Sequence, residues 1–216
     1  MEPEIFINFK HYENAVGKGA EQLLNEFQTV NKKNYYYCLS YMDLYLKSKF
    51  NDMNIFSQSL DSNGYGAFTG SISMDSLIDF HIHGSLLNHS EKRVKGEDII
   101  NTVNNSKKKG FTIVLCVENI EEVKDYAKLA PSYIAYEPPN LIGGNVSVSS
   151  AKPDIIEEAA KICEHYDVNL LVGAGVKTRL DLEKSMELGA SGVLIASGII
   201  RDPKPINKLN SLTNLQ

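Results

Sequence analysis

Short apolar runs alternate with polar or amphipathic stretches from one end of the chain to the other. The runs have the length of β-strands and lack strict apolar–polar alternation, which is typical of strands that are covered on both faces. Eight strands are expected, at Ile5–Ile7, Tyr35–Leu39, Asn54–Ser57, within Phe80–Leu87, and at Thr112–Val117, Tyr133–Tyr136, Asn169–Val172 and Gly192–Ile195.

Helix-type spacing of apolar residues separates many of these strands. It predicts helices at Ala15–Phe27, Glu97–Lys107, Ile120–Ala130, Pro153–Tyr166 and Thr178–Leu188. Strands that alternate with helices indicate a parallel α/β fold, either closed as a barrel or open, and periodicity alone does not choose between the two. Because no linker or shift in composition divides the chain, we expect a single domain over residues 1–216.

Composition narrows the classes of function. The chain has 216 residues, 43% hydrophobic and 23% charged, which suits one globular domain with a real core. The net charge is -5 and the basic residues are scattered, which argues against a nucleic-acid partner. The first residues do not resemble a signal peptide, and no apolar segment approaches the roughly 18 residues of a membrane span.

The three cysteines, Cys38, Cys116 and Cys163, show no close pairing in the sequence. This usage predicts reduced thiols in a cytoplasmic protein. Cys38 and Cys116 stand in apolar strand-like runs, where the role of a small buried hydrophobe is favoured over that of a reactive thiol.

Functional groups of parallel α/β folds gather where the strands end. The first strand is followed by Asn8-Phe9-Lys10, in which Asn8 and Lys10 point to the same side. A lysine buried at that depth needs an anionic partner, either a carboxylate or a phosphate. The alternative is a strand-end lysine in water.

Histidines surround the fourth strand. His89 follows it, ahead of an expected helix start whose free N–H groups would lower the histidine pKa and keep the imidazole neutral as a donor. The alternative is a surface histidine with no role. His81 and His83 could suggest a metal, but no acidic or cysteine ligands accompany them. Packing or hydrogen bonding within the barrel layer is therefore favoured, and no metal site is expected.

The sixth strand ends in Tyr136-Glu137-Pro138-Pro139, and Gly143-Gly144 follows. A glutamate at a strand end, two rigid residues and a glycine pair describe a base attached to a hinged lid, although proline and glycine also mark ordinary turns.

Small residues follow the last two strands, in Gly173–Thr178 and in Ala196-Ser197-Gly198. Such loops let backbone N–H groups approach an anion, and a following helix N-terminus favours negative charge. Phosphate sites of barrels are often built in this position.

The order Asn8-x-Lys10, Asn88-His89-Ser90-Glu91-x-Arg93 and Tyr136-Glu137-Pro138-Pro139-x-Leu141-Ile142-Gly143 strongly resembles the triosephosphate isomerase family. Gly66–Gly70 looks like the long third loop of that family, and the glycine groups near residues 173 and 196 resemble the phosphate loops of its short, archaeal-type branch. Two positions depart from the commonest pattern: Asn88 stands where many members have glycine, and Asn145 where the exit hinge usually has a small residue.

The resemblance implies a (β/α)8 TIM barrel and an isomerase of glycolysis and gluconeogenesis that interconverts dihydroxyacetone phosphate and D-glyceraldehyde 3-phosphate. By resemblance, Glu137 is the base, His89 the electrophile and Lys10 the cation near phosphate and enediolate. Glu91 supports the lysine. The substrate-binding residues are Asn8, Lys10, Gly143, Gly173, Gly175, Ala196 and Ser197.

The resemblance also implies that no metal or organic cofactor is required, and that the protein is a homo-oligomer, either a dimer or a tetramer, through the loop Gly64–Thr69. Two other functions were weighed. Another phosphate-binding barrel enzyme, such as an indole- or thiamin-pathway synthase, would use the same phosphate loops but has no obvious use for His89 and Glu137. A catalytically silent sugar-phosphate binder would not be expected to keep Lys10, His89 and Glu137 together.

Overall fold

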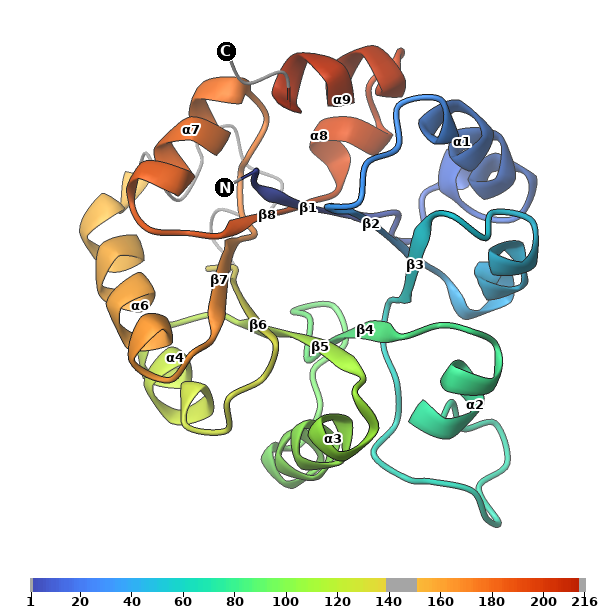
Figure 1. Cartoon of the computed structure of the whole chain (residues 1–216), viewed down its shortest axis with the longest axis horizontal. Coiled ribbons are helices and arrows are strands. Elements are labelled where there is room, and N and C mark those ends of the chain that lie inside the picture. Colours follow the sequence, from blue (N-terminus) through green and yellow to red (C-terminus); the bar gives the residue numbers. More distant parts are fainter. Residues whose placement is uncertain (1, 139–150, 214–216) are drawn as a thin grey trace.

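The computed structural model describes residues 2–138 and 151–213, which form one closed barrel of eight parallel strands in chain order (Figure 1). The first strand pairs with both the second and the eighth, which closes the ring. The strands are β1 (Glu4–Asn8), β2 (Tyr35–Leu39), β3 (Asn54–Ser57), β4 (Gly84–Leu87), β5 (Thr112–Val117), β6 (Tyr133–Tyr136), β7 (Asn169–Val172) and β8 (Gly192–Ile195).

Helices surround the barrel (Figure 1). In the described residues the α-helices are α1 (Lys18–Gln28), α2 (Met74–Asp79), α3 (Gly96–Lys109), α4 (Ile120–Ala127), α6 (Pro153–His165), α7 (Arg179–Glu187), α8 (Ser197–Ile200) and α9 (Pro205–Thr213). Two 3₁₀ helices, η1 (Glu13–Ala15) and η2 (Tyr41–Ser48), complete the set.

The strands follow the sequence prediction closely, and the closed topology settles the choice between barrel and open sheet. The fourth strand is the exception, because α2 occupies the chain before it and only Gly84–Leu87 is extended. His81 and His83 therefore precede the strand as exposed residues, and the placement of both within a barrel layer was wrong. In the part of the chain that the structure describes, no group of three or more potential ligands could hold a metal ion.

Two hydrophobic clusters form the core. An inner cluster fills the barrel and includes Phe6, Phe56, Leu86 and Leu171, while a larger outer cluster lies between the strands and the helices. Side chains alternate between these clusters because successive residues of a strand point to opposite faces. Both faces of the sheet are buried, which explains why the strands are apolar without alternation.

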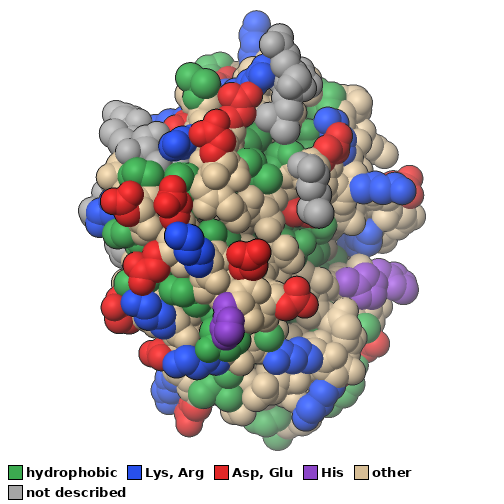
Figure 2. Space-filling model, turned by 60° about the vertical axis from the view of Figure 1, so that its left-hand side comes forward, with side chains coloured by type: hydrophobic (Ala, Val, Ile, Leu, Met, Phe, Trp, Pro, Cys, Tyr) green, Lys and Arg blue, Asp and Glu red, His purple; other side chains and the backbone are tan. Residues whose placement is uncertain are grey.

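The surface carries charges of both signs. Figure 2 shows acidic and basic side chains interspersed on one face of the molecule rather than gathered by sign. The connection between β3 and α2 extends away from the barrel (Figure 1) and carries Tyr65 and Phe68, which are 70% and 53% exposed. Among the described residues, no helix is long and apolar enough to cross a membrane.

Candidate active site

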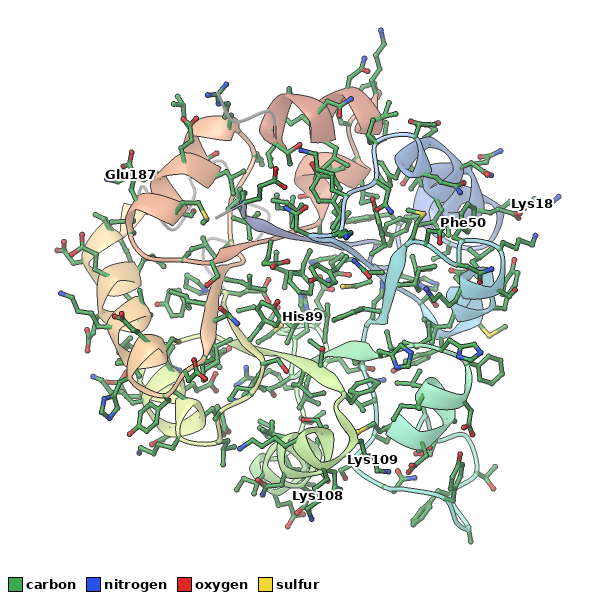
Figure 3. The ribbon with its side chains drawn as sticks, in the orientation of Figure 1. Lys18, Phe50, His89, Lys108, Lys109 and Glu187 are labelled. Atoms are coloured by element: carbon green, nitrogen blue, oxygen red, sulfur yellow. The ribbon has the colours of Figure 1, made fainter. Side chains whose placement is uncertain are left out.

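One cavity opens where the carboxyl ends of the strands meet. Figure 3 shows His89 near the centre of the ring of strands, whereas Lys18, Lys108 and Glu187 lie at the periphery. The cavity brings together the sequence-predicted residues Asn8, Lys10, His89, Glu137, Gly173, Gly175, Ala196 and Ser197. Glu91 lies in an adjoining cavity that shares Asn8, Lys10 and His89, and Gly143 lies outside the described residues.

The two-residue period of the strands explains this convergence. Asn8 comes two residues after Phe6, and Glu137 two residues after Ala135, and both Phe6 and Ala135 belong to the inner cluster of the barrel. The backbone N–H of Glu137 donates to the carbonyl oxygen of Val117 at 2.8 Å, which extends the pairing of β5 and β6 by one step. The side chain of Glu137 is therefore directed to the inside of the barrel by the strand itself.

Lys10 has a left-handed backbone, with φ at 50°, which costs energy for a residue other than glycine. Three polar contacts hold it. The Asn8 Oδ1 accepts the Lys10 backbone N–H at 2.9 Å, and the Gln58 Nε2 donates to the Lys10 carbonyl oxygen at 2.9 Å. The Lys10 Nζ lies 2.7 Å from the Glu91 Oε1 and keeps only 12% of its side chain exposed. The ammonium is thus fixed at the cavity with a carboxylate partner.

His89 is buried beside Lys10, and its Nδ1 accepts the backbone N–H of Glu91 at 3.1 Å. Burial, with a smaller contribution from the nearby charge of Lys10, lowers the pKa of His89 to about 4. The imidazole is therefore neutral at pH 7. Because Nδ1 is an acceptor, the single proton of the neutral ring lies on Nε2, which faces Glu137.

The cause of this lowered pKa differs from the sequence expectation. Residues 90–92 form a turn, and the helix that follows begins only at Gly96. The lowering comes from burial and from Lys10 rather than from a helix N-terminus. The turn is shaped by Asn88, whose backbone is left-handed at φ 62° and whose side chain bonds to the Cys116 carbonyl and the Val94 N–H. An asparagine can thus stand here in place of glycine.

Glu137 is 4% exposed, and burial raises its pKa to about 7. Its Oε2 has no hydrogen-bond partner among the described residues and lies 3.7 Å from the Nε2 of His89. That distance is too long for a hydrogen bond, and the neutral imidazole makes no ion pair. A basic oxygen and an N–H donor therefore face the same cavity without satisfying each other.

Two contacts of Glu137 were not predicted from the sequence: the role of Cys116, and the space that the predicted substrate-binding residue Gly173 leaves for the carboxylate side chain. The thiol of Cys116 interacts with the carboxyl of Glu137 and lowers its pKa, against the larger effect of burial. Gly173 provides space: a Cβ atom there would lie 2.3 Å from Cγ of Glu137. Neither role leaves a signal in the sequence, where Cys116 reads as a core residue and Gly173 as part of a phosphate loop. Gln58 was missed for the same reason, since nothing in the chain order connects it to Lys10.

The loops after β7 and β8 lie at the same cavity. The N-terminus of α7 is closed by its own capping box: Asp181 Oδ2 accepts the backbone N–H groups of Lys177 and Thr178 at 3.1 and 2.9 Å. These two N–H groups at the start of α7 are therefore already bonded to a carboxylate, whereas the sequence analysis expected them to favour an anionic ligand. Ser197 and Gly198, which begin the short helix α8, line the same cavity.

The arrangement defines a class. A (β/α)8 barrel whose C-terminal end combines a buried carboxyl of raised pKa, a neutral imidazole donor, a lysine and small-residue loops is an enzyme of proton transfer on an anionic substrate.

Comparison with known families identifies the member of that class. Residues 3–211 match the family model of triosephosphate isomerase. A triosephosphate isomerase of Thermoplasma volcanium is 46% identical over 208 residues, which covers 96% of this chain and 98% of that protein. Those of Archaeoglobus fulgidus and Saccharolobus solfataricus are 35% and 36% identical and cover 98% and 94% of this chain, and 97% and 91% of their own length. The chain belongs to the triosephosphate isomerase family.

Proposed function

We propose that the chain interconverts dihydroxyacetone phosphate and D-glyceraldehyde 3-phosphate, and that Glu137, His89 and Lys10 carry the reaction. The family membership supports the activity, an isomerisation of glycolysis and gluconeogenesis. The observation that supports the mechanism is the pair formed by the Glu137 Oε2 and the His89 Nε2, 3.7 Å apart and unsatisfied by each other.

In the forward direction, the ionised Glu137 removes a proton from the carbon beside the substrate carbonyl. The electron pair of that C–H bond forms the double bond of an enediolate, and the carbonyl oxygen becomes negative. The Nε2–H of His89 donates to this oxygen, and the charge of Lys10 stabilises it. A proton passes from the neighbouring hydroxyl to the negative oxygen by way of His89, Glu137 returns its proton to the former carbonyl carbon, and the hydroxyl becomes the new carbonyl. These steps need no metal or organic cofactor.

The raised pKa of Glu137 fits this task. A general base works best when its pKa lies near the working pH, and burial brings the carboxyl from its ordinary value to about 7. The lowered pKa of His89 complements it, because a neutral ring next to Lys10 donates a hydrogen bond without adding a second positive charge. The raised pKa of Glu137 and the lowered pKa of His89 thus support the roles of base for the glutamate and of hydrogen-bond donor for the histidine.

The remaining substrate contacts are proposed from position. Asn8, which accepts the backbone N–H of Lys10 and lines the cavity, is proposed to hold the substrate oxygens, and Gly173, Gly175, Ala196 and Ser197 are proposed to bind the phosphate through their backbone. Gly143 is proposed as a further phosphate contact by family resemblance.

The test is conversion of D-glyceraldehyde 3-phosphate in deuterated water. The proposal expects rapid isomerisation and deuterium at the carbon that receives the proton, because Glu137 exchanges with solvent before returning it. Tight binding of the substrate without turnover would instead identify a silent sugar-phosphate binder.

We also propose a homo-oligomer through the loop Gly64–Thr69. Its aromatic residues Tyr65 and Phe68 are largely exposed, and exposed aromatic groups on a protruding loop mark interaction sites. A groove beside the active site, lined by Lys10, Tyr41 and the 80% exposed Met42, is proposed to receive the loop of a second subunit. Such a pairing closes by two-fold symmetry.

Sedimentation of the wild type and of Phe68→Asp tests this assembly. The wild type should sediment as an oligomer, and the variant should dissociate and lose activity. Phe80→Asp is the matched control, since Phe80 is 64% exposed and lies just after α2, outside the loop. A fully active monomeric wild type would contradict the proposal.

A cytoplasmic location is proposed as well. Cys38, Cys116 and Cys163 are all buried and free of disulfides, as is usual for proteins of a reducing compartment. Cell fractionation tests the location, with an enzyme of known cytoplasmic location as the control.

A further inference from the structure

Arg93 ends the motif that carries His89, and the mechanism proposed above gives it no role. Its guanidinium reaches two polar partners among the described residues. The Nη1 donates to the backbone carbonyl oxygen of Asn88 at 3.4 Å, and the Nη2 forms an ion pair with the carboxylate of Glu122. Asn88 comes directly before His89, and Glu122 lies in the first turn of α4. Arg93 therefore connects the segment that carries the histidine (residues 88–94, the histidine turn) to a neighbouring helix.

Contacts at both ends hold the histidine turn. The Asn88 Oδ1 accepts the backbone N–H of Val94 at 3.2 Å, and the Asn88 Nδ2 donates to the carbonyl oxygen of Cys116 at 3.0 Å. The backbone of Asn88 is left-handed at φ 62°, which costs energy for a residue with a side chain. Such a backbone persists only where the surrounding contacts hold it in place. The bond from Arg93 to the Asn88 carbonyl is one of these contacts.

Glu122 is itself fixed in position. Its Oε2 accepts the backbone N–H of Glu118 at 3.0 Å, and its own backbone N–H donates to the Asn119 Oδ1 at 2.9 Å. It stands where the free N–H groups of a helix start favour a negative charge. The side chains of Arg93 and Glu122 are 35% and 19% exposed, so water screens the pair only in part. The carboxylate thus offers Arg93 a well-defined anchor.

The end of β5 supports both reacting groups. The carbonyl oxygen of Val117 accepts the backbone N–H of Glu137 at 2.8 Å, and the carbonyl one residue earlier accepts the side chain of Asn88. Because α4 begins just after this strand end, the ion pair gives the histidine turn a second connection to the same region. The separation of 3.7 Å between the His89 Nε2 and the Glu137 Oε2 depends on these connections. A misplacement of about 1 Å can cost on the order of 100-fold in rate.

We propose that Arg93 is a positioning residue, whose ion pair with Glu122 holds the histidine turn so that His89 faces the catalytic carboxyl. This inference rests on the proposed function for the part that the histidine plays in the reaction. Its structural content is independent of that part, namely that the orientation of the His89 ring depends on the ion pair between Arg93 and Glu122.

Arg93→Met removes the charge and keeps an unbranched apolar stem. For D-glyceraldehyde 3-phosphate, kcat should fall about tenfold and KM should change by less than about twofold, because the substrate contacts remain while the donor is misplaced in the transition state. The matched control is Lys109→Met, since Lys109 pairs with Asp75, is likewise 35% exposed and lies at the end of α3 opposite to the histidine turn. An equal fall of kcat in the control, or a rise in KM in place of the fall in kcat, would overturn the proposal.

Glu122→Gln is the second variant, and it keeps the size of the side chain if the loss of Arg93 weakens the fold. Its kcat should also fall, with circular dichroism to verify folding. The double variant should be no slower than Arg93→Met, because both changes break the same ion pair. Losses that add as free energies would show that Arg93 acts independently of Glu122, against the proposal.

Nitrogen-15 NMR of labelled histidine gives a readout that does not depend on turnover. In the wild type the Nδ1 of His89 accepts the backbone N–H of Glu91, so at neutral pH this ring should give one unprotonated and one protonated nitrogen signal. Arg93→Met should move both signals toward the average of the two tautomers, and Lys109→Met should leave them in place. His89→Gln assigns the signals by their disappearance.

The NMR comparison separates this inference from the proposed function. If the wild type fails to isomerise trioses, the proposed function is wrong, yet the histidine signals of the wild type and Arg93→Met still decide the role of Arg93. Unchanged signals in Arg93→Met, even with a reduced kcat, would place the effect elsewhere and overturn the inference.

Discussion

Two glutamates occupy opposite ends of the barrel interior. Glu4 begins β1 at one end, and Glu137 follows β6 at the other. Burial raises the pKa of both carboxyls, and each has an Oε2 atom without a hydrogen-bond partner among the described residues. Burial and an unsatisfied oxygen are therefore shared by the two ends, and they do not by themselves make a catalytic site.

The two glutamates differ in the residues that surround them. Glu4 lies against the phenols of Tyr36 and Tyr133, which pack with Phe6 as an aromatic layer: the Phe6 and Tyr36 rings stack at 4.2 Å. Glu137 instead faces a neutral imidazole and a cavity lined by small residues and a lysine. A raised pKa becomes useful only where a substrate can reach the carboxyl and a donor lies across from it.

The largest expected effect comes from removing the charge of each glutamate in turn. Glu137→Gln should lower kcat on the order of 1,000-fold, because general base catalysis is lost. Glu4→Gln should change kcat by less than about twofold, because its carboxyl lies far from the cavity by position along the strands. Steady-state kinetics of both variants, with circular dichroism to verify folding, makes the comparison. Comparable losses in the two variants would show that the ends of the barrel are not functionally distinct.

His89→Gln removes the imidazole that faces Glu137 and has no counterpart beside Glu4. We expect a loss of kcat of about 100-fold, the usual size for one hydrogen-bond donor to a developing oxyanion, with little change in the affinity for inorganic phosphate. The matched control is His165→Gln, at the end of α6. A rate within a few-fold of the wild type would exclude His89 as the electrophile.

The buried carboxyl of Glu137 should also be visible in stability. Its pKa is about 7 in the folded state and near its ordinary 4.5 when unfolded, so the folded state holds the proton more tightly between these values. The free energy of unfolding should therefore fall as pH rises from about 4.5 to 7, by at most about 3 kcal/mol, and stay reduced above pH 7.

Chemical denaturation of the wild type and Glu137→Gln at several pH values, at one protein concentration, measures this contribution as the difference between the two curves. His89, whose folded pKa is lowered, acts in the opposite sense between about pH 4 and 6.5 in both proteins, so the difference isolates Glu137. Parallel curves would mean that Glu137 is not destabilised by its burial.

The smallest effect concerns the thiol beside Glu137. Cys116→Val removes the thiol whose interaction with Glu137 lowers the pKa of the carboxyl, so the acid limb of kcat/KM should move to higher pH, by up to about one unit. Cys38→Val is the control, since Cys38 is equally buried in the inner cluster and burial alone raises its thiol pKa. A pH profile that shifts equally in both variants would assign the effect to packing.

The barrel strands were predictable because each is a compact apolar run with clear boundaries, and seven of them lie where the pattern puts them. The 3₁₀ helix η2 and the terminal helix α9 were not predicted, since Tyr41–Ser48 and Pro205–Thr213 carry mixed polar sequences whose helical form depends on packing. The segment ahead of β4 was misread for a related reason: Phe80 is apolar but 64% exposed, so it does not begin a strand.

In the site, the residues with charge or chemistry of their own were found from strand ends and family resemblance. The supporting contacts were not. Gln58 reaches Lys10 across 48 positions of the chain, and Cys116 meets Glu137 from the neighbouring strand. Such contacts depend on register around the barrel, which a linear pattern does not contain. The capping of α7 by Asp181 is local, but its consequence for an anion emerges only from its place beside the cavity.

Gly173 carries a lesson for anyone who would engineer this protein. Replacing glycine with alanine is a common way to stabilise a fold, since it restricts the unfolded chain and gains roughly 0.4–1 kcal/mol where the backbone tolerates it. At this position the added methyl group would collide with the side chain of Glu137 at 2.3 Å. A redesign guided by stability alone would thus displace the carboxyl while every reacting group remained in the sequence, and an inventory of active-site residues would give no warning.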